Sequence, residues 1–195
     1  AYQELGHINR DMGNDEKAII NYRQACELNP ALLASWNMLY QYFVKNKNQP
    51  AADHAQQQIK KLESLPPALL YIDQILNEGR LGLAERQCRA FLKKNPTHTY
   101  AMSLLSEIAN RLGYFDDAEF LLEKAVEFKP KDGDLRMQYA AILRKKQKFA
   151  KTMEQVNILC DQYPDNPIYQ AQKASEMMQN GDHTQAIKMF DSILS

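Results

Sequence analysis

An internal period of 34 residues, marked by recurring proline, glycine and alanine, constrains the fold of this chain more than any other feature. Pro96, Pro130 and Pro164 are spaced by 34 residues, and Pro30 precedes Pro96 by 66. Glycines share a second offset within the period: Gly13, Gly79, Gly113 and Gly181. Alanines follow five residues later: Ala18, Ala52, Ala84, Ala118 and Ala186. Several offsets that recur together predict an array of supersecondary repeats.

Within each period the hydrophobic pattern is helical. Apolar residues recur at helical spacing in blocks of about a dozen, separated by short Gly, Asn, Asp or Pro segments. Only three valines occur, and no period-2 alternation is sustained. We therefore predict an all-α fold of about twelve antiparallel helices, two in each of six repeats. The predicted repeats are 1–32, 33–64, 65–98, 99–132, 133–166 and 167–195.

The repeats resemble the tetratricopeptide repeat (TPR), whose pattern is W-x₂-L-G-x₂-Y…A-x₃-F…P. Repeat two supplies Trp36-x₂-Leu39, repeat one supplies Tyr2-x₂-Leu5-Gly6 and Ala18-x₃-Tyr22, and repeat six supplies Ala186-x₃-Phe190. The resemblance covers residues 1–195 as a single array and implies a right-handed solenoid.

Each signature residue has a physical role in such a hairpin. The alanine is small where the two helices cross, and the glycine adopts the left-handed conformation of a tight turn. Lys47 and Gln147 stand at two of the glycine positions. Since Asn46 and Asn48 flank Lys47, a shift of one residue would place an asparagine there. Asn166-Pro167 predicts a helix N-cap followed by proline at the first helical position.

Repeat two departs most from the pattern. It is about two residues short, Ser64 replaces the proline, and Pro66-Pro67 follows directly. We expect this junction to disturb the regular stacking of repeats.

Composition excludes several classes of protein. The 24 basic residues balance 24 acidic residues, so no field of one sign attracts nucleic acid or an anionic membrane. No apolar run approaches the roughly 20 residues that a membrane span needs. Three cysteines cannot form a complete disulfide framework, which favours a cytoplasmic location. The chain begins without methionine and ends inside an amphipathic pattern, so we expect a fragment of a longer protein.

Motifs for catalysis, metal binding or cofactor binding are missing from the sequence. There is no P-loop, G-x-S-x-G or H-E-x-x-H motif, and the four histidines are scattered. Cys26, Cys88 and Cys160 fall on the inward face of the second helix and are interpreted as small buried hydrophobes. Asp132-Gly133-Asp134 resembles the start of a calcium loop but lacks downstream ligands, so it is interpreted as a connection into the next helix. We predict a chain that is not itself an enzyme and binds no cofactor.

A basic cluster has two interpretations. Arg144, Lys145, Lys146, Lys148 and Lys151 crowd the turn within repeat five. They are either cations placed favourably at a helix C-terminus or an anion-binding rim.

The TPR resemblance implies that the first helices of the repeats line a concave groove for a peptide or partner protein. Carried onto this sequence, the candidate groove residues are His7, Arg10, Asn37, Gln41, Lys45, Asp73, Asn77, Glu107, Asn110, Arg111, Arg144 and Lys145. The lysine and asparagine pattern of carboxylate-clamping members is not reproduced. A protein-interaction scaffold and a solvated face without a defined ligand are both open.

A second resemblance concerns Leu83–Leu194, which looks like the N-terminal arrays of bacterial repeat-containing sulfotransferases. It rests on segments such as Leu105-Ser106-Glu107-Ile108-Ala109-Asn110-Arg111-Leu112-Gly113. This resemblance implies an alternative function, the substrate-recruiting arm of an enzyme whose catalytic domain would lie C-terminal to residue 195.

The last predicted helix carries an apolar stripe of Ile187, Phe190 and Leu194. Each repeat of a solenoid leaves one apolar face for the next repeat. The sequence therefore predicts weak self-association through the C-terminal helix.

Overall fold

The computed structural model describes residues 1–194, and within that range it contains twelve α-helices and no strand. The side chain of Leu194 and the whole of Ser195 lie outside the described residues, so the part of the predicted apolar stripe that falls on Leu194 does too. The chain divides into two compact units, Ala1–Ala84 and Glu85–Ser195. This division falls inside one helix of the third predicted repeat.

The helices follow the predicted repeats closely. The N-terminal unit contains α1 (Tyr2–Asp11), α2 (Asp15–Leu28), α3 (Leu33–Lys45), α4 (Gln49–Glu63), α5 (Pro67–Asn77) and the start of α6 (Leu81–Lys94). The C-terminal unit contains the rest of α6, α7 (Thr99–Arg111), α8 (Phe115–Phe128), α9 (Gly133–Lys145), α10 (Phe149–Gln162), α11 (Pro167–Gln179) and α12 (His183–Leu194). Odd-numbered helices, the first of each repeat, are called A helices here, and even-numbered helices are called B helices.

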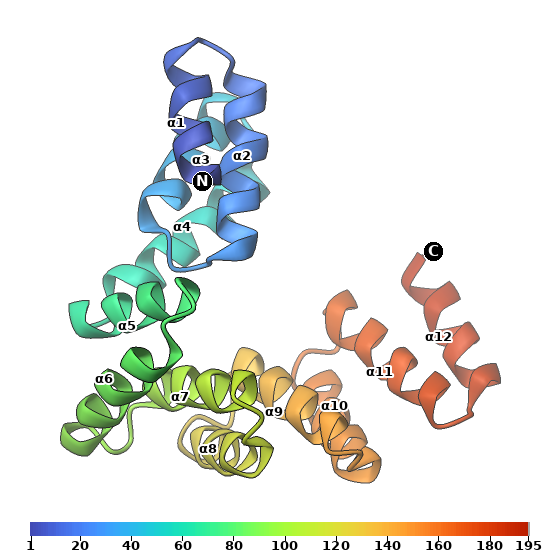
Figure 1. The fold of residues 1–195 in the computed structure, drawn as a ribbon. Helices are drawn as coiled ribbons and strands as arrows, with labels where there is room; N and C mark the ends of the chain where they lie inside the picture. The colour runs from blue at the N-terminus through green and yellow to red at the C-terminus, as the bar shows by residue number, and fades with distance from the viewer. Residues whose placement is uncertain (195) are drawn as a thin grey trace. The chain divides into compact units, whose positions relative to one another are not determined.

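The helices pack as hairpins that stack in sequence (Figure 1). Within the N-terminal unit α1 packs on α2, α3 on α4, and α2 on α3. Within the C-terminal unit α7 packs on α8, α9 on α10 and α11 on α12, while α8 contacts α9 and α10 contacts α11. Helices α2, α8 and α10 therefore each join their own repeat to the A helix of the next one.

Small residues lie where the two helices of a hairpin cross. The repeated alanines are all buried: Ala18, Ala52, Ala84, Ala118 and Ala186. Repeat five has Thr152 at this position, also fully buried, and its hydroxyl donates to the carbonyl of Lys148 at 3.2 Å. The small side chain allows close approach of the backbones, as the sequence predicts.

The turn between the helices of a repeat needs one residue with positive φ. Gly13, Gly79, Gly113 and Gly181 supply it, with φ between 74° and 87°. Lys47 and Gln147 adopt φ of 55° and 57° at the same position. The predicted shift to an asparagine is wrong, because Asn46 and Asn48 keep φ of −92° and −91°.

The hydrogen bonds of this turn explain why the positive φ stays at residues 47 and 147 although neither is a glycine. The amide of Asn48 donates to the carbonyl of Phe43 at 2.9 Å, and the amide of Lys148 donates to Leu143 at the same distance. These bonds close the helix end only when the intervening residue is left-handed. Lys47 and Gln147 therefore carry a conformational cost that glycine would not.

Apolar side chains from consecutive helices form the core of each unit. In the N-terminal unit Ile19, Tyr22 and Cys26 of α2 lie with Leu39 and Phe43 of α3. In the C-terminal unit the main cluster combines buried residues of α7, α8 and α9. They are Met102, Ala109, Ala118, Leu122, Ala125, Val126, Leu135, Tyr139, Ile142 and Leu143. These clusters therefore cross the boundary between repeats one and two and the boundary between repeats four and five.

The cysteines are part of this interior. Cys26, Cys88 and Cys160 are free and buried, as predicted. Burial raises the pKa of the Cys26 and Cys88 thiols to about 12, and it also raises the pKa of Cys160. Thiols in this state are poor nucleophiles.

Candidate functional site

Polar side chains join the three A helices of the C-terminal unit. The Ser103 hydroxyl on α7 donates to Oε1 of Gln138 on α9 at 2.6 Å. Further along the same helices, the Lys145 ammonium donates to Oδ1 of Asn110 at 2.8 Å. Between α9 and α11, Nε of Arg144 lies 2.9 Å from Oε1 of Glu176. We call this set the A-helix row, comprising Ser103, Glu107, Asn110, Arg111, Gln138, Ala141, Arg144, Lys145, Gln172 and Glu176.

Two carboxylates organise the row. Glu107 accepts from Nδ2 of Asn110 at 3.1 Å and from Nε of Arg111 at 2.7 Å. Glu176 is almost fully buried, and its Oε1 also accepts from the Gln172 amide at 2.6 Å. Because a buried carboxylate without a partner is costly, Glu176 holds the Arg144 guanidinium in place. The structure thus links four predicted groove residues, Glu107, Asn110, Arg111 and Lys145, in one network. A fifth, Arg144, belongs to a second group with Glu176 and Gln172.

The predicted groove residues of the N-terminal unit make different contacts. Nδ1 of His7 lies 2.8 Å from the Tyr22 hydroxyl of α2, and the Lys45 ammonium donates to Asp15 of α2 at 3.0 Å. Both side chains therefore turn toward a B helix. Three other predicted residues donate hydrogen bonds to residues close by in sequence: Arg10 to Asp11, Asn37 to the Leu33 carbonyl and Asn77 to Asp73. Gln41 is exposed. Arg10 also donates to the sulfur of Met38 on α3 at 3.3 Å, which is a link between two A helices, whereas the other contacts named here stay within one helix or reach a B helix.

The basic cluster of repeat five is compensated by acidic residues of repeat four. Lys146 donates to both Asp116 and Glu119, and Lys148 donates to the two oxygens of Glu119 at 2.6 Å and 2.8 Å. Burial opposes ionisation of Glu119, but hydrogen bonds from Lys146 and Lys148 outweigh it and lower the pKa of this carboxyl. Hydrogen bonds to Asp116 and then Glu119 raise the pKa of Lys146. Lys146 and Lys148 therefore join neighbouring repeats, which neither interpretation of the sequence anticipated.

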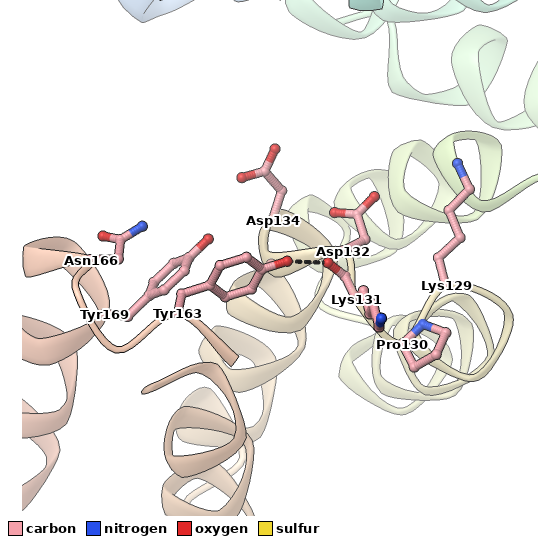
Figure 2. A pocket seen from close by; sticks show the side chains of 9 residues that line it. Lys129, Pro130, Lys131, Asp132, Asp134, Tyr163, Asn166 and Tyr169 are labelled. Carbon is pink, nitrogen blue, oxygen red and sulfur yellow. Dashed lines mark hydrogen bonds between the residues drawn. The ribbon is translucent and has the colours of Figure 1, made fainter. Parts of the chain in front are cut away.

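A shallow pocket of about 680 Å³ lies beside the connection between α8 and α9. Figure 2 shows Tyr163 and Tyr169 side by side, next to the 129–134 segment. The ring centroids are 5.5 Å apart, and the Tyr163 hydroxyl donates to the Lys131 carbonyl. This pocket was not predicted from the sequence. The sequence feature that could have indicated the pocket is Tyr163, an aromatic residue directly before the repeated proline. Other repeats have Asn29, Asn95 or Lys129 at this position.

The residues predicted to lead into the fifth A helix do so. Asp132 is the N-cap of α9, and its carboxylate accepts from the amide of Leu135 at 3.2 Å. Gly133 lies so close to Tyr169 that a Cβ there would be 2.3 Å from the tyrosine hydroxyl oxygen. Asn166 caps α11 in the same way as Asp132, accepting from the amide of Ile168 at 3.0 Å. Across residues 1–194, no group of three or more His, Cys, Asp or Glu side chains is placed to hold a metal ion.

Comparison with known protein families finds a match for two of these hairpins. A model of the tetratricopeptide repeat matches residues 1–32 and 100–132. These segments coincide with the first and fourth predicted repeats to within one residue. No curated protein sequence matches the chain.

Several solved structures share the fold. A MamA fragment (residue 41 to the end) from Desulfovibrio magneticus RS-1 is 16% identical, with a TM-score of 0.59 over 83% of this chain and 93% of its own. Another MamA structure is 15% identical, with a TM-score of 0.57 over 99% of this chain and 88% of its own. Pseudomonas aeruginosa PilF is 16% identical, with a TM-score of 0.52 over 96% of this chain and 86% of its own.

Together these findings confirm the predicted class, an all-α fold of the TPR solenoid type. The family model matches two of the six repeats, and the solved structures share the fold over most of the chain. At identities this low, structural similarity indicates a shared fold but not a shared function. The function therefore has to be inferred from the residues of this chain. Among the described helices, none combines the length and apolar character required to cross a bilayer.

Proposed function

We propose that this chain is a protein-interaction module and that the A-helix row of the C-terminal unit binds an extended segment of a partner protein. The observation that carries the proposal is the set of cross-helix links Ser103–Gln138, Asn110–Lys145 and Arg144–Glu176. They fix polar side chains over three consecutive repeats. Side chains that are ordered before binding lose less conformational entropy when a ligand arrives.

The chemistry of the row suits a polypeptide backbone. Its amide, hydroxyl, guanidinium and ammonium groups can donate to or accept from peptide groups, and Lys145 uses one of its three N–H donors on Asn110. Ala141 is exposed on α9 between Gln138 and Arg144, and its small side chain leaves room for a ligand. The two ion pairs of the row cancel and leave Lys145 as one net positive charge, so we expect a partner segment without a strong positive charge.

No catalytic step is part of the proposal. The cysteine thiols are buried with raised pKa values, and the carboxylates of the row are engaged with cationic or amide partners. The row therefore holds a ligand but offers it no activated nucleophile.

Two matched variants, each of which replaces an exposed alanine with arginine, test the proposal. Dodecapeptides are selected from a random phage-displayed library on the whole chain, and their affinities are measured by fluorescence anisotropy. Ala141→Arg places a long side chain on the row, whereas Ala150→Arg places it on an exposed position of α10. We expect Ala141→Arg to weaken binding by about tenfold or more, equivalent to ~1.4 kcal/mol. Ala150→Arg should bind as the unmodified chain does, and equal affinities for both variants would contradict the proposal.

A further inference from the structure

The turn between α11 and α12 carries the only Asn-Gly pair in the sequence, Asn180-Gly181. Asn180 is the C-cap residue of α11, with φ of −84° and ψ of 2°, and Gly181 follows with φ of 87°. Both residues are exposed. Within the described part of the chain the Asn180 side chain makes no hydrogen bond. The side-chain amide of Asn180 and the backbone amide that follows it therefore lie together in a turn that is open to solvent.

Repeat two provides a matched asparagine in the same kind of turn. Asn46 is the C-cap residue of α3, with φ of −92° and ψ of 11°, and it is also exposed. Its Nδ2 donates to the Tyr42 carbonyl at 2.9 Å, and the residue that follows it is Lys47. A side chain on the following residue crowds the backbone nitrogen, whereas glycine leaves that nitrogen accessible. The two turns therefore share a backbone conformation, but only Asn180 combines an untethered amide with a following glycine.

The openness of this turn does not depend on its place near the end of the array. Gly79 and Gly113 are the equivalents of Gly181 in repeats three and four, each with a repeat on both sides. A Cβ built on any of the three glycines meets no heavy atom within 4 Å. Stacking of repeats therefore leaves the turn uncovered, and exposure of Gly181 follows from its position in the repeat.

From these observations we propose that Asn180 is a site of spontaneous deamidation. The backbone nitrogen of Gly181 attacks Cγ of Asn180 and forms a C–N bond, which closes a cyclic succinimide. The bond between Cγ and Nδ2 breaks, and Nδ2 leaves as ammonia together with the proton lost by the Gly181 amide. Water then opens the ring at Cγ to give aspartate, or at the main-chain carbonyl carbon of Asn180 to give isoaspartate. Water is the only co-reactant, and no oxidant or reductant is needed.

The backbone hydrogen bonds of the turn set the condition for this reaction. The Gly181 amide donates to the Met178 carbonyl at 3.1 Å, so this bond must open before the nitrogen attacks. Helix ends open locally at low free-energy cost. The reaction therefore proceeds from a briefly opened last turn of α11.

Either product weakens the end of α11. An aspartate at residue 180 adds negative charge at the negative end of the helix dipole, and an isoaspartate lengthens the backbone inside a hydrogen-bonded turn. The Asn180 amide donates to the carbonyl of Glu176 at 3.0 Å in the same turn, and Glu176 pairs with Arg144. Deamidation therefore loosens the segment that holds the Arg144 guanidinium.

Peptide mapping by mass spectrometry tests the proposal on the whole folded chain, incubated in mildly alkaline buffer at body temperature. Deamidation replaces an NH₂ group by OH, so the mass of the tryptic peptide 174–188 rises. We expect Asn180 to convert faster than Asn46 by about tenfold or more, and to give both aspartate and isoaspartate. An unchanged Asn180, or equal rates at the two asparagines, overturns the proposal. Aspartate without isoaspartate also overturns it, because direct hydrolysis of the side chain does not pass through the ring.

Two variants separate the roles of the asparagine and the glycine. Asn180→Gln lengthens the side chain, disfavours the ring closure, and should leave residue 180 largely unmodified. Lys47→Gly places an Asn-Gly pair in the turn of repeat two, where residue 47 already has φ of 55°, and it should speed the conversion of Asn46. Circular dichroism confirms that both variants are folded. The proposal fails if Asn180→Gln converts as fast as the unmodified chain, or if Asn46 converts no faster in Lys47→Gly.

Discussion

Glu119 on α8 accepts hydrogen bonds from Lys148 at both of its carboxylate oxygens, at 2.6 Å and 2.8 Å, across the junction between repeats four and five. Lys148 is the N-cap residue of α10, so one nearly buried carboxylate joins the second helix of one repeat to the second helix of the next. Lys146 adds a third donor from the end of α9. The contact between these repeats is therefore ionic as well as apolar, and its strength depends on pH.

We expect acid to weaken this junction through Glu119. Its pKa is lowered in the folded chain, so its stabilising contribution is complete above the ordinary value of 4.5 and is lost as the pH falls below it. The lowered pKa of Asp116, which Lys146 bonds, acts in the same direction. Glu119→Gln should cost about 1 kcal/mol at pH 7, after allowance for solvent screening, and less at pH 3. Urea unfolding at both pH values measures this, and an equal cost at both would contradict the assignment.

Ala118→Leu should destabilise the fourth repeat. Ala118 is fully buried where α7 crosses α8, and the Ser106 hydroxyl donates to its carbonyl at 3.2 Å. A larger side chain forces the helices apart, with an expected cost of about 1–3 kcal/mol. Ala150→Leu, at an exposed position of α10, is the matched control. Thermal unfolding that does not distinguish the two variants would mean that the hairpin crossing is misplaced.

Gln147→Gly should stabilise the fifth repeat. Residue 147 has φ of 57°, and the left-handed conformation costs a non-glycine residue about 1–2 kcal/mol. Part of this gain is offset because glycine has more freedom in the unfolded chain, so we expect a net gain of about 0.5–1 kcal/mol. Gln147→Ala, which keeps the strain, should be close to neutral. If the turn carried no strain, Gln147→Gly would unfold at a urea concentration no higher than Gln147→Ala does.

Gly133→Ala should disturb the tyrosine pocket. The new Cβ would lie 2.3 Å from the Tyr169 hydroxyl oxygen, so the ring must move. We expect a loss of about 1–3 kcal/mol in unfolding free energy, as for other overpacked sites. Tyr169→Phe removes the atom that clashes, so the double variant should recover most of the loss. A double variant no more stable than Gly133→Ala would place the strain elsewhere.

The fold was predictable because each repeat carries its own local signals. The 34-residue spacing of Pro96, Pro130 and Pro164 places the helices, and Ala118 and its equivalents place the crossings. The conformation of Lys47 was not predictable from residue preference, because backbone hydrogen bonds of the turn override it.

The candidate site was predictable only in part. Helical register places Glu107, Asn110 and Arg144 on one side of their helices, but pairing across repeats depends on tertiary distances. The sequence therefore did not reveal Arg144–Glu176, Lys146–Glu119 or the Tyr163–Tyr169 pocket. The sulfotransferase resemblance and the cytoplasmic location stay predictions, which the sequence flanking residues 1–195 in a longer protein would test.

The most direct test of the central claim is the footprint of a selected dodecapeptide on the whole chain, measured by hydrogen–deuterium exchange with and without peptide. Binding to the A-helix row should slow exchange in α7, α9 and α11 around Asn110, Ala141 and Glu176. Protection centred instead on the Tyr163–Tyr169 pocket or on α8 and α10, with α7 and α9 unchanged, would contradict the assignment of the A helices as the binding surface.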